Sequence, residues 1–370
     1  MIKYIYIDDN PNISAQTSKS FSVSGRMETV LGDFKTSWNA QISYIKDIVR
    51  NTTNCNPQNE NECSFGGFML DLKLNDVSHD DVFAQHSGTS IAQELRTLQK
   101  EGDLEFFPIV LFSANENLLE DSNNLFDLRL SKDSPDYENS SKQMLAVYDA
   151  YKYLKNNRLD CCALGIDPTL LDDRLVSELD SFAPQPPHVI IRFLITQLLE
   201  RQGVLINEDV LFARLGIDKA NLSQTSIDTI KDKLLCIKYT GILSGGWDRW
   251  WAPKLEDLWD TISEGSYLRS TTAPERVAKF SEYFELTDIK PFEHENKDFF
   301  ISDKYWTVCK GSNKPLDPID GFLIQGQERF YPWQEKEYVS KYCALTSENK
   351  EVWKDVAVTE KERLEILREG

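Results

Sequence analysis

The stretch Tyr4-Ile5-Tyr6-Ile7-Asp8-Asp9-Asn10-Pro11 opens the chain with a short apolar run that stops at two aspartates. β-Branched and aromatic residues on both faces of such a run are typical of a buried parallel strand. A secretory signal peptide would instead begin with basic residues and contain a longer apolar core. We therefore expect a buried first strand whose carboxyl end presents Asp8 and Asp9.

Three further apolar runs end at a polar residue in the same way: 67–70 before Asp71, 107–112 before Ser113, and 126–130 before Lys132. Segments with helical apolar spacing alternate with these runs, at 38–49, 88–100 and 144–154. Strands that alternate with helices predict an α/β fold with a doubly wound, mostly parallel sheet. Such sheets bind ligands beyond the carboxyl ends of their strands, which is where these polar residues are expected to meet.

The polar residues expected at this edge suit phosphoryl transfer. Three neighbouring carboxylates, from Asp8, Asp9 and Asp71, repel one another unless a cation lies among them, and Mg²⁺ prefers hard oxygen ligands of this kind. An aspartate beside the ion can attack a phosphoryl donor, and the lysine and hydroxyl of Lys132 and Ser113 can contact phosphoryl oxygens. The alternative, in which the polar edge is merely solvated, stays open.

These segments, together with GTSIAQELR at 88–96, resemble the receiver domains of two-component response regulators over residues 1–157. The resemblance implies a flavodoxin-like domain with a five-stranded parallel sheet. It implies that Asp71 is phosphorylated by a histidine kinase or phosphotransfer protein. It also implies functional roles for the other residues of the site: Mg²⁺ binding by Asp8, Asp9, Asp71 and the backbone carbonyl of Lys73, and contact with the phosphoryl group by Ser113 and Lys132.

The sequence departs from this family around the lysine. Asp133 follows Lys132 where the family has proline, often in a cis peptide, and Arg129 replaces the usual aromatic switch residue. A cis bond before a non-proline residue costs several kcal/mol, so we expect this turn to be built differently. Two long polar segments, 52–62 and 75–85, are expected to flank the site and to shield it or dock a partner.

The second half resembles no family. Residues 158–187 are predicted to form a connector because prolines punctuate them, and residues 188–370 to form a mainly helical α+β domain with a sub-boundary near 265–300. Helices are expected at 188–200, 207–215 and 226–234, and a strand at 236–243. The interaction candidates are Trp247, Arg249, Trp250 and Trp251, because Trp and Arg dominate interface hot spots and can stack on bases. The alternative is that these tryptophans anchor the core.

Amino-acid composition limits the classes of partner and the cellular location that we expect for this protein. The net charge of −19 argues against DNA binding, since a phosphate-tracking surface is basic. No apolar run approaches the ~20 residues of a membrane-spanning helix. The missing signal peptide and membrane span predict a cytoplasmic protein without membrane contact. The seven cysteines fit this location, because they form no CxxC pair and are too sparse for a disulfide scaffold, which indicates reduced thiols.

From these observations we expect a two-component signalling protein that is not itself an enzyme. Its output would be protein–protein interaction of the C-terminal domain with a downstream partner, and bacterial stress or antiphage systems are one setting in which such proteins occur. A homodimer is compatible with this reading. Two alternatives stay open: a phosphorylation-independent pseudo-receiver that acts as a binding or scaffold protein, and an effector enzyme with an unrecognised active site in residues 188–370.

Overall fold

The computed structural model describes residues 1–53, 64–75, 82–114, 125–133, 135–327, 330–346 and 355–369. The chain divides into two compact units. The first unit contains residues 1–164, 179–194 and 241–247, and the second contains 165–178, 195–240 and 248–370. Much of the two long polar segments predicted to flank the site falls outside the described residues.

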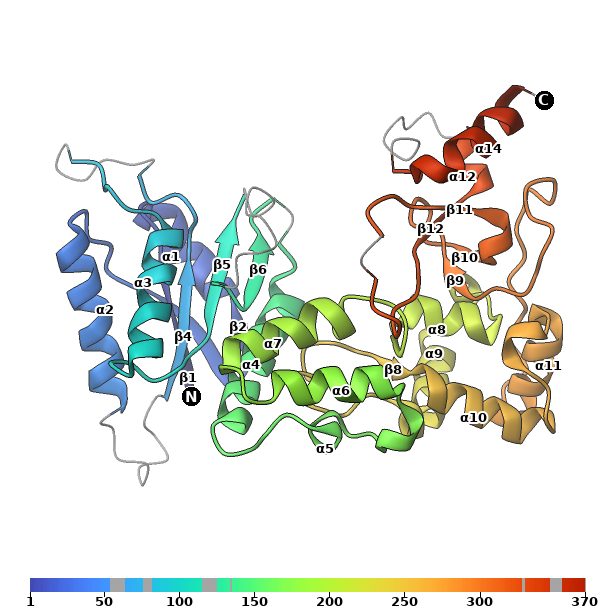
Figure 1. Ribbon diagram of the computed structural model, residues 1–370, viewed down its shortest axis with the longest axis horizontal. Coiled ribbons are helices and arrows are strands. Elements are labelled where there is room, and N and C mark those ends of the chain that lie inside the picture. The colour runs from blue at the N-terminus through green and yellow to red at the C-terminus, as the bar shows by residue number, and fades with distance from the viewer. Residues whose placement is uncertain are drawn as a thin grey trace. The chain divides into compact units, whose positions relative to one another are not determined.

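A six-stranded sheet lies at the centre of the first unit (Figure 1). Its strands have the spatial order β2-β3-β1-β4-β5-β6. The strands are β1 (Ile2–Ile7), β2 (Ser22–Val23), β3 (Met27–Leu31), β4 (Ser64–Leu70), β5 (Ile109–Ser113) and β6 (Leu128–Ser131). All neighbouring pairs run parallel except β2 with β3. The predicted α/β class is confirmed, and the sheet is mostly parallel. The β2–β3 hairpin at its edge was not predicted.

Helices cover both faces of this sheet. They are α1 (Pro11–Ser20), α2 (Trp38–Thr53), α3 (Gly88–Glu101) and α4 (Tyr137–Leu154). One face buries Ile7 and Phe68 against Ile45 of α2 and Leu95 of α3. On the other face, the Tyr4 hydroxyl donates a hydrogen bond to a backbone carbonyl of α4, at 2.8 Å. Burial on both faces explains why β1, β4 and β5 are continuous apolar runs rather than alternating ones.

A buried ion pair joins α3 to the segment that enters β6. The Arg96 guanidinium, 6% exposed, donates to Asp127 Oδ2 at 2.8 Å and to the carbonyl of Leu125 at 3.0 Å. Asp127 also accepts from the Tyr151 hydroxyl and from the backbone N–H of Ile109, at 2.8 and 2.7 Å. Such a network fixes the geometry of the core because each buried charge has its partners.

Helices also occupy the segment predicted to be a connector. They are α5 (Cys161–Leu164) and α6 (Asp173–Phe182), and α7 (Pro187–Leu194) follows. Within the first unit, α7 packs against α4, and His188 at its start stacks on Phe106 with ring centroids 5.8 Å apart. The first unit therefore extends beyond the sheet and its four helices.

The second unit is rich in helices and carries short two-stranded sheets. Its helices are α8 (Glu208–Leu215), α9 (Gln224–Lys233), α10 (Ala252–Ser263), α11 (Ala273–Phe284), α12 (Lys341–Thr346) and α14 (Val358–Glu369). Its paired strands are β7 (Leu205–Ile206) with β8 (Trp250–Trp251), β9 (Thr307–Val308) with β10 (Pro315–Leu316), and β11 (Gly321–Leu323) with β12 (Tyr338–Ser340). A 3-10 turn at Leu235–Ile237 and irregular chain occupy the segment predicted as a strand at 236–243, so that prediction was wrong.

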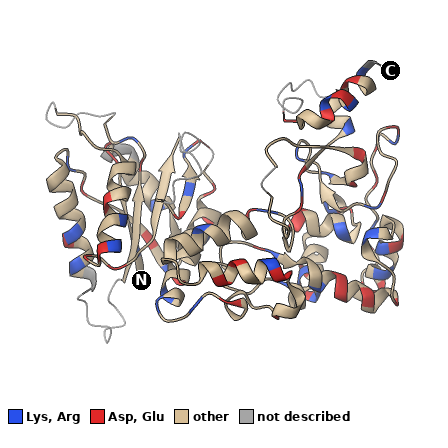
Figure 2. Cartoon of the chain, in the orientation of Figure 1, with Lys and Arg blue, Asp and Glu red and all other residues tan. Residues whose placement is uncertain are grey.

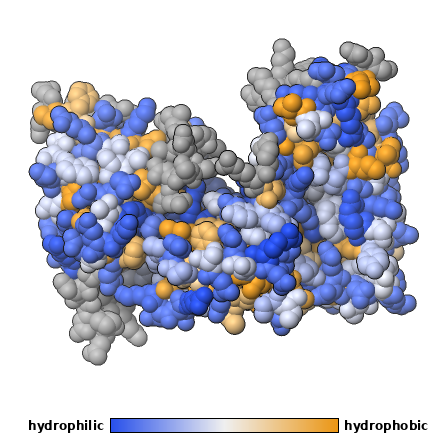
Figure 3. Space-filling model, viewed as in Figure 1, coloured by the Kyte–Doolittle hydropathy of each residue, from blue (hydrophilic) through white to orange (hydrophobic). Residues whose placement is uncertain are grey.

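The helices of the second unit carry charges of both signs, as α10 and α11 show in Figure 2. The face of the molecule drawn in Figure 3 is mostly hydrophilic, with scattered hydrophobic residues. In the parts of the chain that the structure describes, no helix combines the length and apolar character needed to cross a bilayer.

Candidate metal centre

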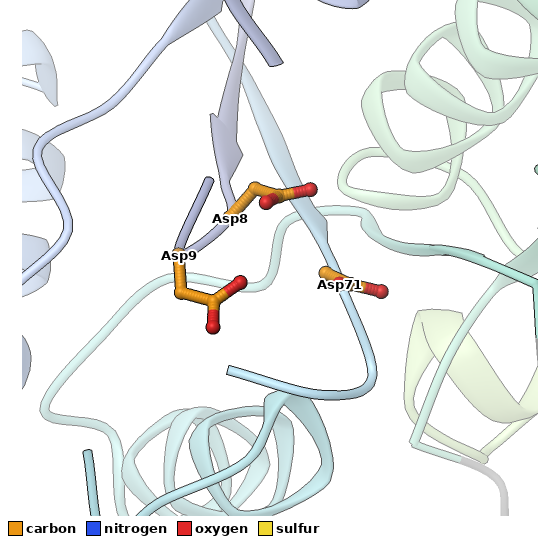
Figure 4. Close-up of side chains that lie close together, drawn as sticks. All are labelled: Asp8, Asp9 and Asp71. Carbon is orange, nitrogen blue, oxygen red and sulfur yellow. The ribbon is translucent and has the colours of Figure 1, made fainter. Parts of the chain in front are cut away.

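Three carboxylates meet at the carboxyl edge of the sheet. Asp8 and Asp9 follow β1, and Asp71 follows β4, its parallel neighbour, in which Leu70 lies opposite Ile7. The oxygens that these side chains could offer to a metal lie within 4.8 Å of one another (Figure 4). Along the chain, β3 pairs with one side of β1, and β4 then pairs with the other side. The carboxylates therefore lie at the switch point where sheets of this class bind ligands.

Lys132 joins this cluster from the far end of the sheet. Its Nζ lies 2.9 Å from Asp8 Oδ2 and 3.1 Å from Asp71 Oδ2. The lysine follows β6, and its backbone N–H donates to the carbonyl of Ser113 at 3.0 Å, which brings the ends of β5 and β6 together. The described residues contain no cis peptide, and Lys132, which Asp133 follows, contacts both carboxylates.

Hydrogen bonds from the strand ends orient two of the carboxylates. The Tyr6 hydroxyl donates to Asp8 Oδ2, and the backbone N–H of Asn10 donates to Asp8 Oδ1 at 2.8 Å. The backbone N–H of Leu72 donates to Asp71 Oδ1 at 2.8 Å. Tyr6 was not predicted as a site residue, although its position two residues before Asp8 places both on one side of an extended chain.

The charges in this cluster shift one another's pKa values in opposite directions. Burial raises the pKa of Asp8, but the Tyr6 hydrogen bond and the Lys132 ammonium outweigh it, so the net shift is downward. Burial raises the pKa of Asp71, the nearby Asp8 adds to this, and the opposing effect of Lys132 does not cancel it. Burial lowers the pKa of Lys132, but attraction to Asp71 and Asp8 raises it on balance. The lysine is therefore charged at neutral pH.

The donor set fits a divalent cation. Asp8 and Asp9 are 5% and 3% exposed, so their charges are poorly screened by water. With all groups ionised, three carboxylates and one ammonium carry −3 + 1 = −2, which a doubly charged ion neutralises. Carboxylate oxygens are the ligands that Mg²⁺ prefers.

The close approach of α3 to the backbone of Asp71 requires a glycine at position 88. A Cβ at residue 88 would lie 2.0 Å from the Asp71 carbonyl oxygen, a distance that no side chain tolerates. The Gly88 N–H instead donates to the carbonyl of Leu72 at 3.0 Å. The start of α3 therefore packs directly against the backbone of the candidate phosphoacceptor.

Three further residues singled out by the sequence lie on or directly after strands of the same sheet. Ser113 is buried at the end of β5, and Arg129 is half-buried on β6. Lys73 follows Asp71 by two residues and has an exposed side chain. Metal binding by the Lys73 carbonyl and phosphoryl binding by the Ser113 hydroxyl stay predictions.

Of the predicted interaction residues of the second half, the three tryptophans lie in the interior of their units, and Arg249 is half-buried. Trp247 in the first unit is 5% exposed, and Trp250 and Trp251 in the second are 1% and 0% exposed. Arg249 donates from Nε to the carbonyl of Leu199 at 2.6 Å. These placements are those of the alternative in which the tryptophans anchor the core.

A scan against protein-family models and a search of curated proteins each find no match to this chain.

Proposed function

We propose that residues 1–157 form a receiver-type domain in which Asp71 accepts a phosphoryl group in a Mg²⁺-dependent reaction. The donor is a histidine kinase or phosphotransfer protein in the cytoplasm. One observation carries the proposal: Asp8, Asp9 and Asp71 gather at the switch point of the sheet, and Lys132 bridges two of them. The parallel strands run in the order β3-β1-β4-β5-β6, which, numbered among themselves, is the 2-1-3-4-5 order of flavodoxin-like folds.

Each residue of the site has a distinct part in this proposal. Mg²⁺ held by Asp8, Asp9, Asp71 and the Lys73 carbonyl would neutralise charge on the phosphoryl oxygens. The Asp71 carboxylate is the nucleophile, and the N–H of Leu72 holds its Oδ1. Lys132 and the Ser113 hydroxyl then receive the phosphoryl oxygens.

Phosphorylation would change the interactions of Lys132 first. The ammonium now divides its contacts between Asp8 and Asp71, and a phosphoryl group on Asp71 would offer it a more highly charged partner. A local change of charge of this kind can bias a two-state element. We propose that the output is an altered contact with a downstream protein.

The test is phosphorylation of the purified protein with Mg²⁺ and a small phosphodonor, read by intact mass. We expect the gain of one acid-stable, base-labile phosphoryl group, which is lost in Asp71→Asn and after chelation of Mg²⁺. Asp149→Asn is the matched control, because Asp149 lies in the same unit in an exposed ion pair with Arg26. An equal mass gain in Asp71→Asn would place the phosphate elsewhere and refute the assignment.

A second candidate function is a pseudo-receiver that binds a partner without being phosphorylated. The observation that favours it is the same Lys132 bridge, because a lysine between Asp8 and Asp71 already supplies a positive charge where the metal would act. The phosphodonor test, combined with calorimetric titration with Mg²⁺, separates the two functions. No phosphorylation, whether or not Mg²⁺ binds, would support the pseudo-receiver, whereas phosphorylation of Asp71 would exclude it.

A further inference from the structure

Two cysteines in the second unit lie on either side of one serine. Cys309 follows β9, and Cys343 lies in α12, which begins directly after Ser340. The backbone N–H of Ser340 donates to Cys309 Sγ at 3.1 Å, and the Cys309 thiol lies 3.3 Å from Ser340 Oγ. The same Oγ accepts a hydrogen bond from the backbone N–H of Cys343 at 3.1 Å. Residues 34 positions apart in the chain (343 − 309) thus share one hydroxyl.

The two thiols differ in access to solvent. Cys309 is 1% exposed and belongs to an apolar cluster with Leu316, Phe322 and Val339. Cys343 packs against the same cluster but remains partly exposed. A small oxidant can therefore reach the pair from the side of Cys343.

The surroundings favour the ionised form of the buried thiol. A hydrogen bond from the Cys343 thiol, with further ones from Ser312 and Ser340, lowers the pKa of Cys309 although burial opposes this. The same hydrogen bond, together with burial, raises the pKa of Cys343. Cys309 is thus the more acidic thiol of the pair, and a thiolate is the species that reacts in thiol oxidation and exchange.

We propose that Cys309 and Cys343 form a dithiol modification site that closes to a disulfide when the protein meets a peroxide. In the first step, the accessible Cys343 passes its proton to the Cys309 sulfur, and the resulting Cys343 thiolate attacks the peroxide. A sulfur–oxygen bond forms as the O–O bond breaks, which yields a sulfenic acid and, with one proton from solvent, one water. The Cys309 sulfur then attacks the Cys343 sulfur, and the hydroxyl leaves as a second water. The two thiols lose two protons and two electrons, and the peroxide is reduced.

The disulfide would join the end of β9 to α12. These elements contribute to one small apolar cluster that also contains Phe322 of β11 and Val339 of β12. The bond would therefore lock this part of the second unit together. This site is independent of Asp71, so its outcome does not depend on the proposed phosphorylation.

The test maps cysteine linkage in the full-length protein. The reduced protein is treated with graded hydrogen peroxide, blocked with an alkylating agent and digested with trypsin without reduction. Cleavage after lysine places Cys309 in peptide 305–310 (YWTVCK) and Cys343 in peptide 342–350 (YCALTSENK). We expect these peptides to appear joined, with a loss of two hydrogens, and to separate after reduction.

The matched control is the exposed Cys236, which lies in peptide 234–238 (LLCIK) of the same unit. Cys343→Ser should abolish the joined peptide, and Cys236→Ser should leave its yield unchanged. The proposal is overturned if Cys309 and Cys343 are recovered separately alkylated at peroxide concentrations that already oxidise Cys236. It is also overturned if protein unfolded in urea gives the same yield of the joined peptide, because the folded geometry would then have no effect.

Discussion

Replacing Lys132 with methionine is expected to destabilise the first unit and to make its stability depend more strongly on Mg²⁺. Methionine retains most of the side-chain length but removes the charge that lies between Asp8 and Asp71. The variant leaves three carboxylates facing one another without a cation from the protein. Their repulsion then opposes folding until a metal ion neutralises them.

The magnitude follows from the two contacts of the ammonium. They measure 2.9 and 3.1 Å, and the lysine side chain is 28% exposed while those of Asp8 and Asp71 are 6% and 13% exposed. Removing one partner from a fully buried ion pair costs ~3–5 kcal/mol. Because Lys132 is partly solvated, we expect a loss of about 2–3 kcal/mol in the free energy of unfolding without metal.

Mg²⁺ should recover part of this loss. In the wild type the ion must compete with the lysine ammonium, and in the variant it does not. A tenfold tighter affinity would correspond to ~1.4 kcal/mol of extra stabilisation at saturating metal. The difference in stability between wild type and variant should therefore shrink by about that amount when Mg²⁺ is added.

The assay is urea unfolding of both proteins, with Mg²⁺ and with a chelator, followed by far-UV circular dichroism. Lys155→Met is the control, because Lys155 forms an exposed ion pair with Glu105 in the same unit, and such pairs contribute ~0–1 kcal/mol. The reasoning would be refuted if Lys132→Met unfolded at the wild-type urea concentration without metal. Equal stabilisation of both proteins by Mg²⁺ would refute the competition between ion and lysine.

Three further predictions concern other residues of the first unit. Asp127→Asn should lower the free energy of unfolding by ~3–5 kcal/mol in urea, because it leaves a buried guanidinium without its carboxylate, whereas Asp149→Asn in an exposed pair should change little. Gly88→Ala should slow phosphorylation of the protein by a small phosphodonor, because the added Cβ would lie 2.0 Å from the backbone oxygen of Asp71, the proposed phosphoacceptor. Gly245→Ala should leave the rate unchanged, because the nearest atom to its added Cβ would be 3.9 Å away. Burial lowers the pKa of His188 to about 4, below the value of ~6.5 in the unfolded chain, so the unfolded chain takes up this proton first as the pH falls. The free energy of unfolding should therefore decrease from pH ~6.5 toward 4, and His188→Gln should make it less dependent on pH in this range.

The strands that carry the site were predictable because each is a local pattern. The runs that became β1, β4 and β5 are mostly apolar and are followed by or end in a polar residue, and β6 (LRLS) alternates leucine with polar residues. β3 escaped prediction because it is buried mainly on one side and its run, METVL, is mixed in character. The segment 236–243, in contrast, was predicted to be a strand and is not one. Its apolar residues Ile237, Tyr239 and Leu243 are buried, but they pack from turns rather than from a strand.

The interior partners were harder to predict than the elements. The Arg96–Asp127 pair joins a helix to a distant strand entry, and no sequence pattern around either residue indicates its partner. The dithiol of Cys309 and Cys343 has no sequence signature, since the cysteines are far apart in the chain and are brought together by the packing of β9, β12 and α12. Pairings of this kind depend on which segments pack together, and periodicity carries no information on that.

By itself, the sequence determined the α/β class of the first unit and the set of polar residues that end its strands. Both follow from neighbouring residues, because strand burial and strand ends leave a pattern in a few consecutive positions. Only the tertiary structure decided how the charges of the site are compensated. Asp8 and Lys132 are separated by 124 positions in the chain, and their contact exists because β1, β4, β5 and β6 run parallel and end at one edge. The Tyr6 hydroxyl and the Lys132 ammonium lower the pKa of Asp8, whereas burial and the nearby Asp8 raise that of Asp71. This difference arises from distances and burial that the order of residues does not encode locally.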